Sequence, residues 1–279
     1  MSTIYRPDAM NGKSQAKLTT ISEKRFEQRQ ALWKQTAQKR ELADQLLLKL
    51  TKDDKEIEKL MKAAHNTSVF ISKNGVNPRE PKEPNDHPPR PAQGPTIIQL
   101  NAPWGLVWTW SSAPNDPPLA MAQNLNDPEL GQVGAMGLNL RTDRGRSVES
   151  GSMAVGAWFQ PPRSGLMTVS ANPTITYGYG NSAFLRSSHT HAWMGFFIQE
   201  WTLDGTFVKN DVDQQINLWD LTTDHDFVGD RTFPLTASIP VVSDHNYAIW
   251  VWAGGDAESN ALSYGSLNVN LSNISIGII

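Results

Sequence analysis

The sequence contains no cysteine in its 279 residues. This absence excludes disulfide bonds, thiolate zinc sites and cysteine nucleophiles together. No apolar run approaches about 18 residues, so we expect no membrane-spanning helix. The first residues lack the apolar stretch of a secretory signal, so we expect no signal peptide. A chain without cysteine suits reducing and oxidising surroundings alike, and the compartment therefore stays open.

Familiar catalytic motifs are also missing. The sequence has no Walker loop, dinucleotide-binding fingerprint, GxSxG elbow or HExxH pair. The enzyme classes that those motifs identify are therefore excluded. We expect a protein that is not an enzyme, with no catalytic residue and no required cofactor.

Lysine is nearly absent after residue 96, where Lys209 is the only one. Residues 97–279 carry 7 basic and 16 acidic residues, a net charge of −9, whereas residues 1–65 carry 14 basic and 9 acidic residues, a net charge of +5. Such a break in composition indicates two structural units with different tasks. The acidic unit is poorly suited to phosphate backbones, so we expect no nucleic-acid partner.

The N-terminal part predicts a mobile end over residues 1–20 and a helical segment over residues 21–65. Between Ala43 and Ala64 the seam residues follow alternating steps of three and four, as in a coiled coil. Thr51 opens a sequence like a capping box, so one long helix and a helical hairpin both remain open. An apolar seam on a helix must pack against another surface. That surface is the following domain, a second copy in a homo-oligomer, or a membrane.

Residues 66–95 form a proline-rich linker, with seven prolines between Pro78 and Pro95. So many prolines exclude a helix or a central strand and favour an extended, semi-rigid spacer. The alternative is a proline-rich ligand for an aromatic groove.

Residues 96–279 predict a mainly β fold. Apolar strand-like runs alternate with turn sequences such as APNDPP, QPPRSG, LDG and AGGDAES. This pattern is typical of an antiparallel β-sandwich or jelly-roll head, and no βαβ alternation is present. The predicted strands cover residues 97–100, 104–110, 152–160, 165–171, 191–201, 205–209, 246–254 and 266–279.

The best-defined local element is a hairpin around Asp204 and Gly205. As a two-residue type I′ turn, this dipeptide would pair Glu200 with Lys209 and Trp201 with Val208. The strand before the turn is apolar at both parities, which predicts a central strand buried on both faces. Its apolar residues are Trp193 and Phe197 on one face and Met194, Phe196 and Ile198 on the other.

Two histidines, His189 and His191, lie at the start of that strand and share the Trp193 face. With a third ligand such as Asp224 or Asp226 they would form a metal site, but two ligands alone are not one. We favour histidines that are solvated or hydrogen-bonded.

Six aspartates crowd residues 210–231. Closely spaced carboxylates on a loop would bind Ca²⁺, although no EF-hand spacing is present. A solvated acidic loop is the expectation that we favour, with Ca²⁺ as an optional ligand.

Aromatic residues supply the candidate ligand-binding site. Trp104, Trp108 and Trp110 are expected on one face of a single strand, either as core or as a platform on which sugar rings stack. Tyr177 and Tyr179 lie in a glycine-rich sequence with the composition of a binding loop, although an ordinary hairpin end is equally compatible.

In the last predicted strand, the apolar residues shift from odd-numbered to even-numbered positions. Leu267, Val269 and Leu271 alternate with polar residues, and the isoleucines from Ile274 onward occupy the opposite parity. A bulge near Ser272 would restore one buried face. We expect this strand inside a sheet or in an oligomer contact, because a bare apolar edge aggregates.

Together these features predict a non-enzymatic, oligomeric binding or structural protein. Its helical segment would serve assembly, and its sandwich head would bind a glycan or another cell-surface ligand or build a shell. The arrangement is similar, in architecture alone, to trimeric fibre heads, jelly-roll adhesins and capsid modules. The alternatives are a metal-dependent hydrolase using His189 and His191, and a cell-targeting toxin.

Overall fold

A computed structural model describes most of the β region and part of the helical segment. The described residues are Thr20, Ile21, Glu23, Lys24, Glu27, Gln28, Ala31, Gln35, Gln38, Lys39, Leu42, and ranges 96–112, 120–127, 131–142, 147–182, 188–221, 225–259 and 262–279. Those between residues 20 and 42 are helical. The predicted mobile end, the seam beyond residue 42 and the proline-rich linker lie outside the described residues. Within the described part, no helix has the length and apolarity needed to cross a bilayer.

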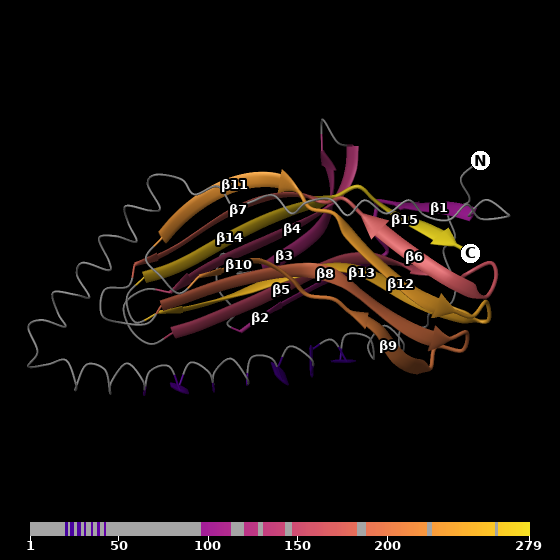
Figure 1. Ribbon diagram of the computed structural model, residues 1–279, viewed down its shortest axis with the longest axis horizontal. Helices are drawn as coiled ribbons and strands as arrows, with labels where there is room; N and C mark the ends of the chain where they lie inside the picture. The colour runs from indigo at the N-terminus through magenta and orange to yellow at the C-terminus, as the bar shows by residue number, and fades with distance from the viewer. Residues whose placement is uncertain are drawn as a thin grey trace, which may run out of the picture.

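The described β region is built of antiparallel strands, which confirms the mainly β prediction (Figure 1). The strands are β1 (Thr96–Asn101), β2 (Leu106–Ser111), β3 (Ala120–Asp127), β4 (Gly131–Thr142), β5 (Ser147–Phe159), β6 (Gly165–Ala171), β7 (Thr174–Ser182), β8 (Ser188–Thr202), β9 (Phe207–Asp213), β10 (Ile216–Leu221), β11 (His225–Thr232), β12 (Leu235–Val241), β13 (His245–Ser259), β14 (Leu262–Leu271) and β15 (Asn273–Ile278).

These strands form three sheets in two layers. A six-stranded sheet has the order β10-β8-β13-β5-β2, with β9 also paired to β8. A five-stranded sheet has the order β11-β7-β14-β4-β3, and a four-stranded sheet has the order β1-β15-β6-β12. The last two lie end to end in one layer, opposite the six-stranded sheet (Figure 1).

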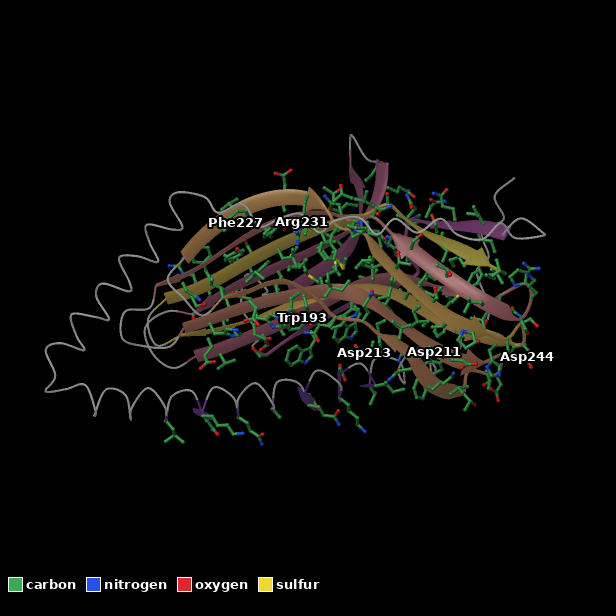
Figure 2. All side chains as sticks on the ribbon, in the orientation of Figure 1. Trp193, Asp211, Asp213, Phe227, Arg231 and Asp244 are labelled. Atoms are coloured by element: carbon green, nitrogen blue, oxygen red, sulfur yellow. The ribbon has the colours of Figure 1, made fainter. Side chains whose placement is uncertain are left out.

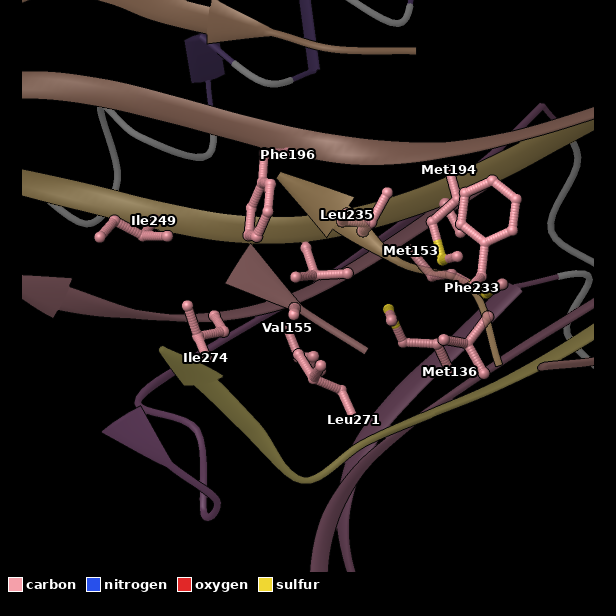
Figure 3. Close-up of a cluster of buried hydrophobic side chains, with 14 of the residues drawn as sticks. Met136, Met153, Val155, Met194, Phe196, Phe233, Leu235, Ile249, Leu271 and Ile274 are labelled. Atoms are coloured by element: carbon pink, nitrogen blue, oxygen red, sulfur yellow. The ribbon is translucent and has the colours of Figure 1, made fainter. Parts of the chain in front are cut away.

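The core lies between the layers and takes side chains from all three sheets (Figure 3). Phe196 and Ile249 come from the six-stranded sheet, Leu271 from the five-stranded sheet and Ile274 from the four-stranded sheet. All four are at most 1% exposed. The sandwich is therefore closed by one continuous apolar layer rather than by separate small cores.

The C-terminal parity change marks a passage between sheets. β14 pairs with β4 and β7, whereas β15 pairs with β1 and β6, so the chain changes sheets at Ser272. The bulge that we predicted there is wrong, because each parity is already buried within its own sheet. The expectation that the last strand lies inside a sheet is confirmed, since β15 has a partner on both sides.

The β8–β9 hairpin also differs from the prediction in one detail. The Gly205 amide donates to the Thr202 carbonyl at 3.0 Å, and Gly205 has a φ of 83°. These contacts define a three-residue loop with glycine in the left-handed region, not a two-residue type I′ turn. Trp201 therefore pairs with Phe207 rather than Val208, and a register shift restores the predicted pairing of Glu200 with Lys209.

Several sequences that predicted loops are strands. The AGGDAES sequence continues β13, the tyrosine- and glycine-rich sequence forms most of β7, and the aspartate-rich sequence contributes to β9, β10 and β11. Of the four predicted turn sequences, APNDPP falls outside the described residues, while QPPRSG and LDG connect strands as predicted.

Candidate functional site: a tryptophan face

The outer surface of the six-stranded sheet carries a second apolar cluster, separate from the core. Seven of the ten tryptophans of the chain lie in it. We call this surface the tryptophan face; it comprises Leu106, Trp108, Trp110, Ala154, Trp158, Trp193, Phe197, Trp201, Phe207, Ala248, Trp250 and Trp252. Figure 2 shows Trp193 at the six-stranded sheet.

Strand alternation and register explain why these side chains gather. Residues two apart on a strand share a face, so one parity of each strand forms the core and the other forms the tryptophan face. Along one row across the sheet, Trp110 pairs with Ser152, Ser152 with Gly254, and Gly254 with Trp193. The central strands of this row contribute small residues, and the outer strands contribute indoles.

Small residues are required in the middle of the row. A Cβ on Gly254 would overlap the Ser152 hydroxyl and would lie 2.8 Å from an indole carbon of Trp193. The Trp193 indole therefore lies where a side chain on β13 would stand. The strip of small residues along β5 also includes Ala154 and Gly156.

Exposure divides the indoles into two groups. Trp108, Trp110 and Trp158 are half-buried, whereas Trp193, Trp201, Trp250 and Trp252 are buried. Edge-to-face contacts connect the indoles: the rings of the two buried residues Trp193 and Trp252 are 6.0 Å apart at 64°, and half-buried Trp158 lies 5.8 Å from buried Trp201 at 84°.

Among the described residues, the buried indole N–H groups of Trp201 and Trp250, at Nε1, have no acceptor. Buried indole N–H groups normally find one, because an unpaired donor costs about 1–3 kcal/mol. Both donors are shielded from solvent, so among the described residues their desolvation is uncompensated.

The two candidate metal-ligating histidines extend the same face. His189 Nε2 lies 2.7 Å from Asp220 Oδ1, and His191 Nε2 lies 3.0 Å from Asn217 Oδ1. The His191 ring also contacts Trp193, with centroids 4.9 Å apart. Both imidazoles are buried and face separate polar partners.

Of the two predicted third metal ligands, the structure describes the position of Asp226 alone. Asp226 lies on β11 in the five-stranded sheet, in the other layer, and Asp224 is outside the described residues. Among the residues described, no group of three or more histidine, aspartate or glutamate side chains is arranged to hold a metal.

Trp104 is not on the tryptophan face. It precedes β2, packs in the core and donates from Nε1 to the Leu271 carbonyl at 3.1 Å. The prediction that it shares a strand face with Trp108 and Trp110 is wrong, because β2 begins only at Leu106.

Tyr177 and Tyr179 form a second aromatic cluster rather than a loop. Both lie on β7 and stack between Trp219 and Phe227, with centroid distances of 5.0–5.9 Å. Arg231 lies over the Tyr177 ring, 5.5 Å from its centroid. Burial, together with Tyr177, raises the pKa of Tyr179, and Arg231 opposes the shift. Within this cluster only Phe227 and Arg231 are exposed. Tyr177, Tyr179 and Trp219 are half-buried or buried and pack at the edge of the sandwich.

A polar cluster that the sequence only partly indicated lies at the far end of β8. Lys209 Nζ is 3.3 Å from Glu200 Oε2 and 2.8 Å from Asp211 Oδ1. Glu200 Oε1 accepts from the Tyr247 hydroxyl and lies 2.6 Å from His245 Nδ1. The Glu200–Lys209 pair was predictable from the hairpin, but the contacts of Glu200 with His245 and Tyr247 join residues distant in sequence.

This cluster shifts the two carboxyl groups in opposite directions. Burial raises the pKa of Asp211, and Lys209 only partly opposes it. Burial also acts to raise the pKa of Glu200, but hydrogen bonds with His245 and Lys209 outweigh it and hold the pKa below its ordinary value. Two of the aspartates that the structure describes take part in separate contacts, because Asp211 pairs with Lys209 and Asp220 with His189.

Comparison with known proteins gives only distant similarities. No family model and no curated protein matches the sequence. Among solved structures, the cleaved adhesin domain K1 of Lys-gingipain from Porphyromonas gingivalis W83 is 10% identical, with a TM-score of 0.26, and the match covers 66% of this chain and 99% of that one.

Two further structures are similar at the same level. The module TmCBM61, solved with β-1,4-galactotriose, is 9% identical, with a TM-score of 0.23 and coverage of 63% of this chain and 90% of that one. The enzymatically active domain of tailspike protein 4 of bacteriophage CBA120 is 11% identical, with a TM-score of 0.21; the match covers 66% of this chain and 19% of that one. Similarity this low transfers neither ligand nor activity to this chain.

Proposed function

We propose that this protein is a non-enzymatic binding protein whose sandwich recognises a glycan through the tryptophan face. The observation that carries the proposal is the set of half-buried indoles on β2 and β5, Trp108, Trp110 and Trp158, around the strip of small residues along β5. The seven tryptophans of this face are not needed to form the core, because the core between the layers is a separate and continuous apolar cluster. An apolar cluster on an outer sheet surface is typical of a binding site.

An indole surface suits a sugar for a physical reason. Its flat apolar face packs against the C–H side of a pyranose ring, and its N–H edge donates to hydroxyl oxygens. An exposed polar residue borders the indoles, because Asn217 on β10 pairs with Trp193 on β8. The surface therefore combines stacking area with hydrogen-bonding groups, which is the combination that orients a sugar.

Affinity electrophoresis of the full chain tests the proposal. The gels would contain neutral polysaccharides, namely a β-galactan, a β-glucan and a xylan. We expect retardation by at least one of them and a loss of about three- to tenfold in affinity for Trp110→Ala, since one aromatic contact contributes about 0.5–1.5 kcal/mol.

Phe227→Ala is the matched control, because Phe227 is an aromatic residue that is 40% exposed and lies outside the tryptophan face. It is expected to keep wild-type retardation. If no polysaccharide retards the protein, or if Trp110→Ala and Phe227→Ala behave alike, the glycan proposal is overturned.

We further propose that the helical segment supports assembly into a homo-oligomer. The support is the heptad-like seam between Ala43 and Ala64. Light scattering on the full chain tests this part, and a monomer across micromolar concentrations would contradict it.

A further inference from the structure

An arginine without an ionic partner lies at the edge of the sandwich. Arg231 is on β11, the edge strand of the five-stranded sheet, and its side chain is exposed. Its guanidinium carbon lies 4.9 Å from the centroid of the Phe233 ring and 5.5 Å from that of the Tyr177 ring. Among the residues that the structure describes, no carboxylate forms an ion pair with it. The neighbouring Asp230 lies on the opposite side of the strand, because successive side chains alternate.

The rings that contact the guanidinium are fixed in place. Tyr177 is half-buried and stacks on Trp219 of the opposite layer, with centroids 5.9 Å apart at 12°. Trp219 is buried and donates from Nε1 to the Thr190 hydroxyl at 3.1 Å. Phe233 is also buried and packs in the core. A cation–π contact uses none of the five N–H donors of a guanidinium, so Arg231 is positioned while its donors stay available.

The Tyr177 hydroxyl adds a further donor at the same place. Within the described part of the chain this hydroxyl has no hydrogen-bond partner. It belongs to the ring against which Arg231 lies, so the two groups can bind one ligand together. Phe227, whose ring is 5.6 Å from that of Tyr177, is 40% exposed and supplies an apolar surface beside them. Figure 2 shows Phe227 and Arg231 on the same strand, β11.

Charge and shape narrow the class of ligand. Residues 97–279 carry 7 basic and 16 acidic residues, so an unpaired guanidinium is an uncommon positive site in this unit. A planar guanidinium matches a carboxylate, which accepts two parallel hydrogen bonds from it. The net charge of −9 repels polyanions, so a ligand with a single carboxylate is favoured. The exposed ring of Phe227 suits a carboxylate that is attached to a six-membered ring.

We infer that Arg231 and Tyr177 form a binding site for a single carboxylate on a six-membered ring, as in a sugar acid or an aromatic acid. The guanidinium donates two hydrogen bonds to the carboxylate, the Tyr177 hydroxyl donates a third, and the ligand ring packs on Phe227. β7 and β11 belong to the five-stranded sheet, so this site is separate from the tryptophan face and does not depend on the proposed glycan function. Neutral polysaccharides lack the carboxylate, so Phe227→Ala remains a valid control for them.

Isothermal titration calorimetry of the full chain tests the site with three probes. These are D-galacturonate, benzoate and D-galactose, which is the neutral counterpart of the first. We expect at least one of the two acids to bind with a dissociation constant of about 1 mM. Galactose is expected to bind at least about tenfold more weakly, because it forms no charge-assisted hydrogen bond with Arg231. The acid that binds identifies the ligand as a sugar acid or an aromatic acid.

Variants assign the binding to these residues. Arg231→Gln is expected to weaken acid binding by about tenfold or more, since it removes the charged donor. Arg141→Gln is the matched control, because it removes the same charge from an exposed position on β4 of the same sheet, and it should keep wild-type affinity. Arg231→Lys keeps the charge without the planar fork and should fall between the two. Tyr177→Phe removes the hydroxyl alone and should cost about threefold, which serves if Arg231→Gln fails to fold.

Three results would overturn the inference: no binding of either acid well above the millimolar range, equal affinity in Arg231→Gln and Arg141→Gln, or galactose binding as tight as that of the acids. A protein that binds a neutral polysaccharide but neither acid would lose the carboxylate site and keep the glycan proposal. A protein that binds an acid through Arg231 but no neutral polysaccharide would keep the carboxylate site and lose the glycan proposal.

Discussion

Glu200 and Lys209 face each other across the β8–β9 hairpin, with Oε2 3.3 Å from Nζ. Lys209 is the only lysine after residue 96, and the same ammonium group lies 2.8 Å from Asp211 Oδ1. Both carboxylates have side chains less than 10% exposed, whereas Lys209 is 53% exposed. The half-exposed ammonium group of Lys209 therefore forms ion pairs with two buried carboxylates, those of Glu200 and Asp211.

Lys209→Met is predicted to destabilise the fold by about 1–3 kcal/mol, because it leaves two buried carboxylates without their cation. Chemical denaturation measures the loss. Lys209→Arg keeps the charge and is expected to lose less than half as much. Equal losses in the two variants would show that the ion pairs contribute nothing.

The same cluster predicts a pH dependence with two signs. The folded pKa of Glu200 lies below its ordinary 4.5, so its contribution to stability is present above that pH and is lost as the pH falls through the folded pKa. The folded pKa of Asp211 lies above its ordinary 3.8, so its contribution is present below that pH and is lost as the pH rises through the folded pKa.

Two variants separate these contributions. Between pH 7 and pH 3, Glu200→Gln should lose less unfolding free energy than the wild type, and Asp211→Asn should lose more. Denaturant titrations across this range provide the measurement. If the two variants move in the same direction, the opposite shifts are wrong.

Gly156→Ala is predicted to destabilise the six-stranded sheet by about 1–3 kcal/mol, as overpacking does. A Cβ there would overlap the Ile249 carbonyl oxygen on the neighbouring strand. Gly277→Ala is the control, because no atom lies within 4 Å of the added Cβ. Comparable melting temperatures for the two variants would argue against the close pairing of β5 with β13.

Ile276→Ala tests the passage of the chain between sheets. Ile276 is fully buried in β15, so the substitution is expected to cost about 2–5 kcal/mol. Ile97→Ala, on β1 at 72% exposure, should change the unfolding free energy by less than about 0.5 kcal/mol. A small effect at Ile276 would contradict its place in the core.

Metal removal is predicted to leave the melting temperature unchanged, because the Nε2 atoms of His189 and His191 face separate polar partners. Thermal unfolding with and without EDTA checks this. A drop that zinc reverses in the wild type but not in His191→Ala would favour the hydrolase alternative, and a drop that calcium reverses would place an ion at the aspartates.

Much of the fold could be predicted from apolar parity. The two apolar parities of β8 predicted a central strand, and Trp193 and Phe196 do lie on opposite faces of the six-stranded sheet. The parity change after Leu271 was also visible, but whether a bulge or a second sheet explains it depends on pairing with β1 and β6, which the local sequence does not specify.

Glycine-rich strands were the main omission. Gly254 and Gly255 looked like turn residues, yet β13 continues through them. A Cβ at Gly255 would lie about 3 Å from Leu138 and Leu140, and at Gly254 it would meet Trp193. These glycines make room for side chains of other strands, which is a tertiary requirement that turn propensity does not reveal.

The sequence predicted single residues of the candidate site, but not that they share one face. Trp110 and His191 were each selected from local sequence, and both prove to lie on the outer surface of one sheet. Their common face follows from the order β8-β13-β5-β2. No local pattern encodes that order, so the tryptophan face emerges only from the assembled sheet.

The most direct test of the central claim is oxidation of the half-buried tryptophans with N-bromosuccinimide, mapped by mass spectrometry with and without the bound polysaccharide. The tryptophan face as the ligand site predicts that oxidation of Trp108, Trp110 and Trp158 falls when the ligand is present. Unchanged oxidation of these three residues at saturating ligand would contradict it.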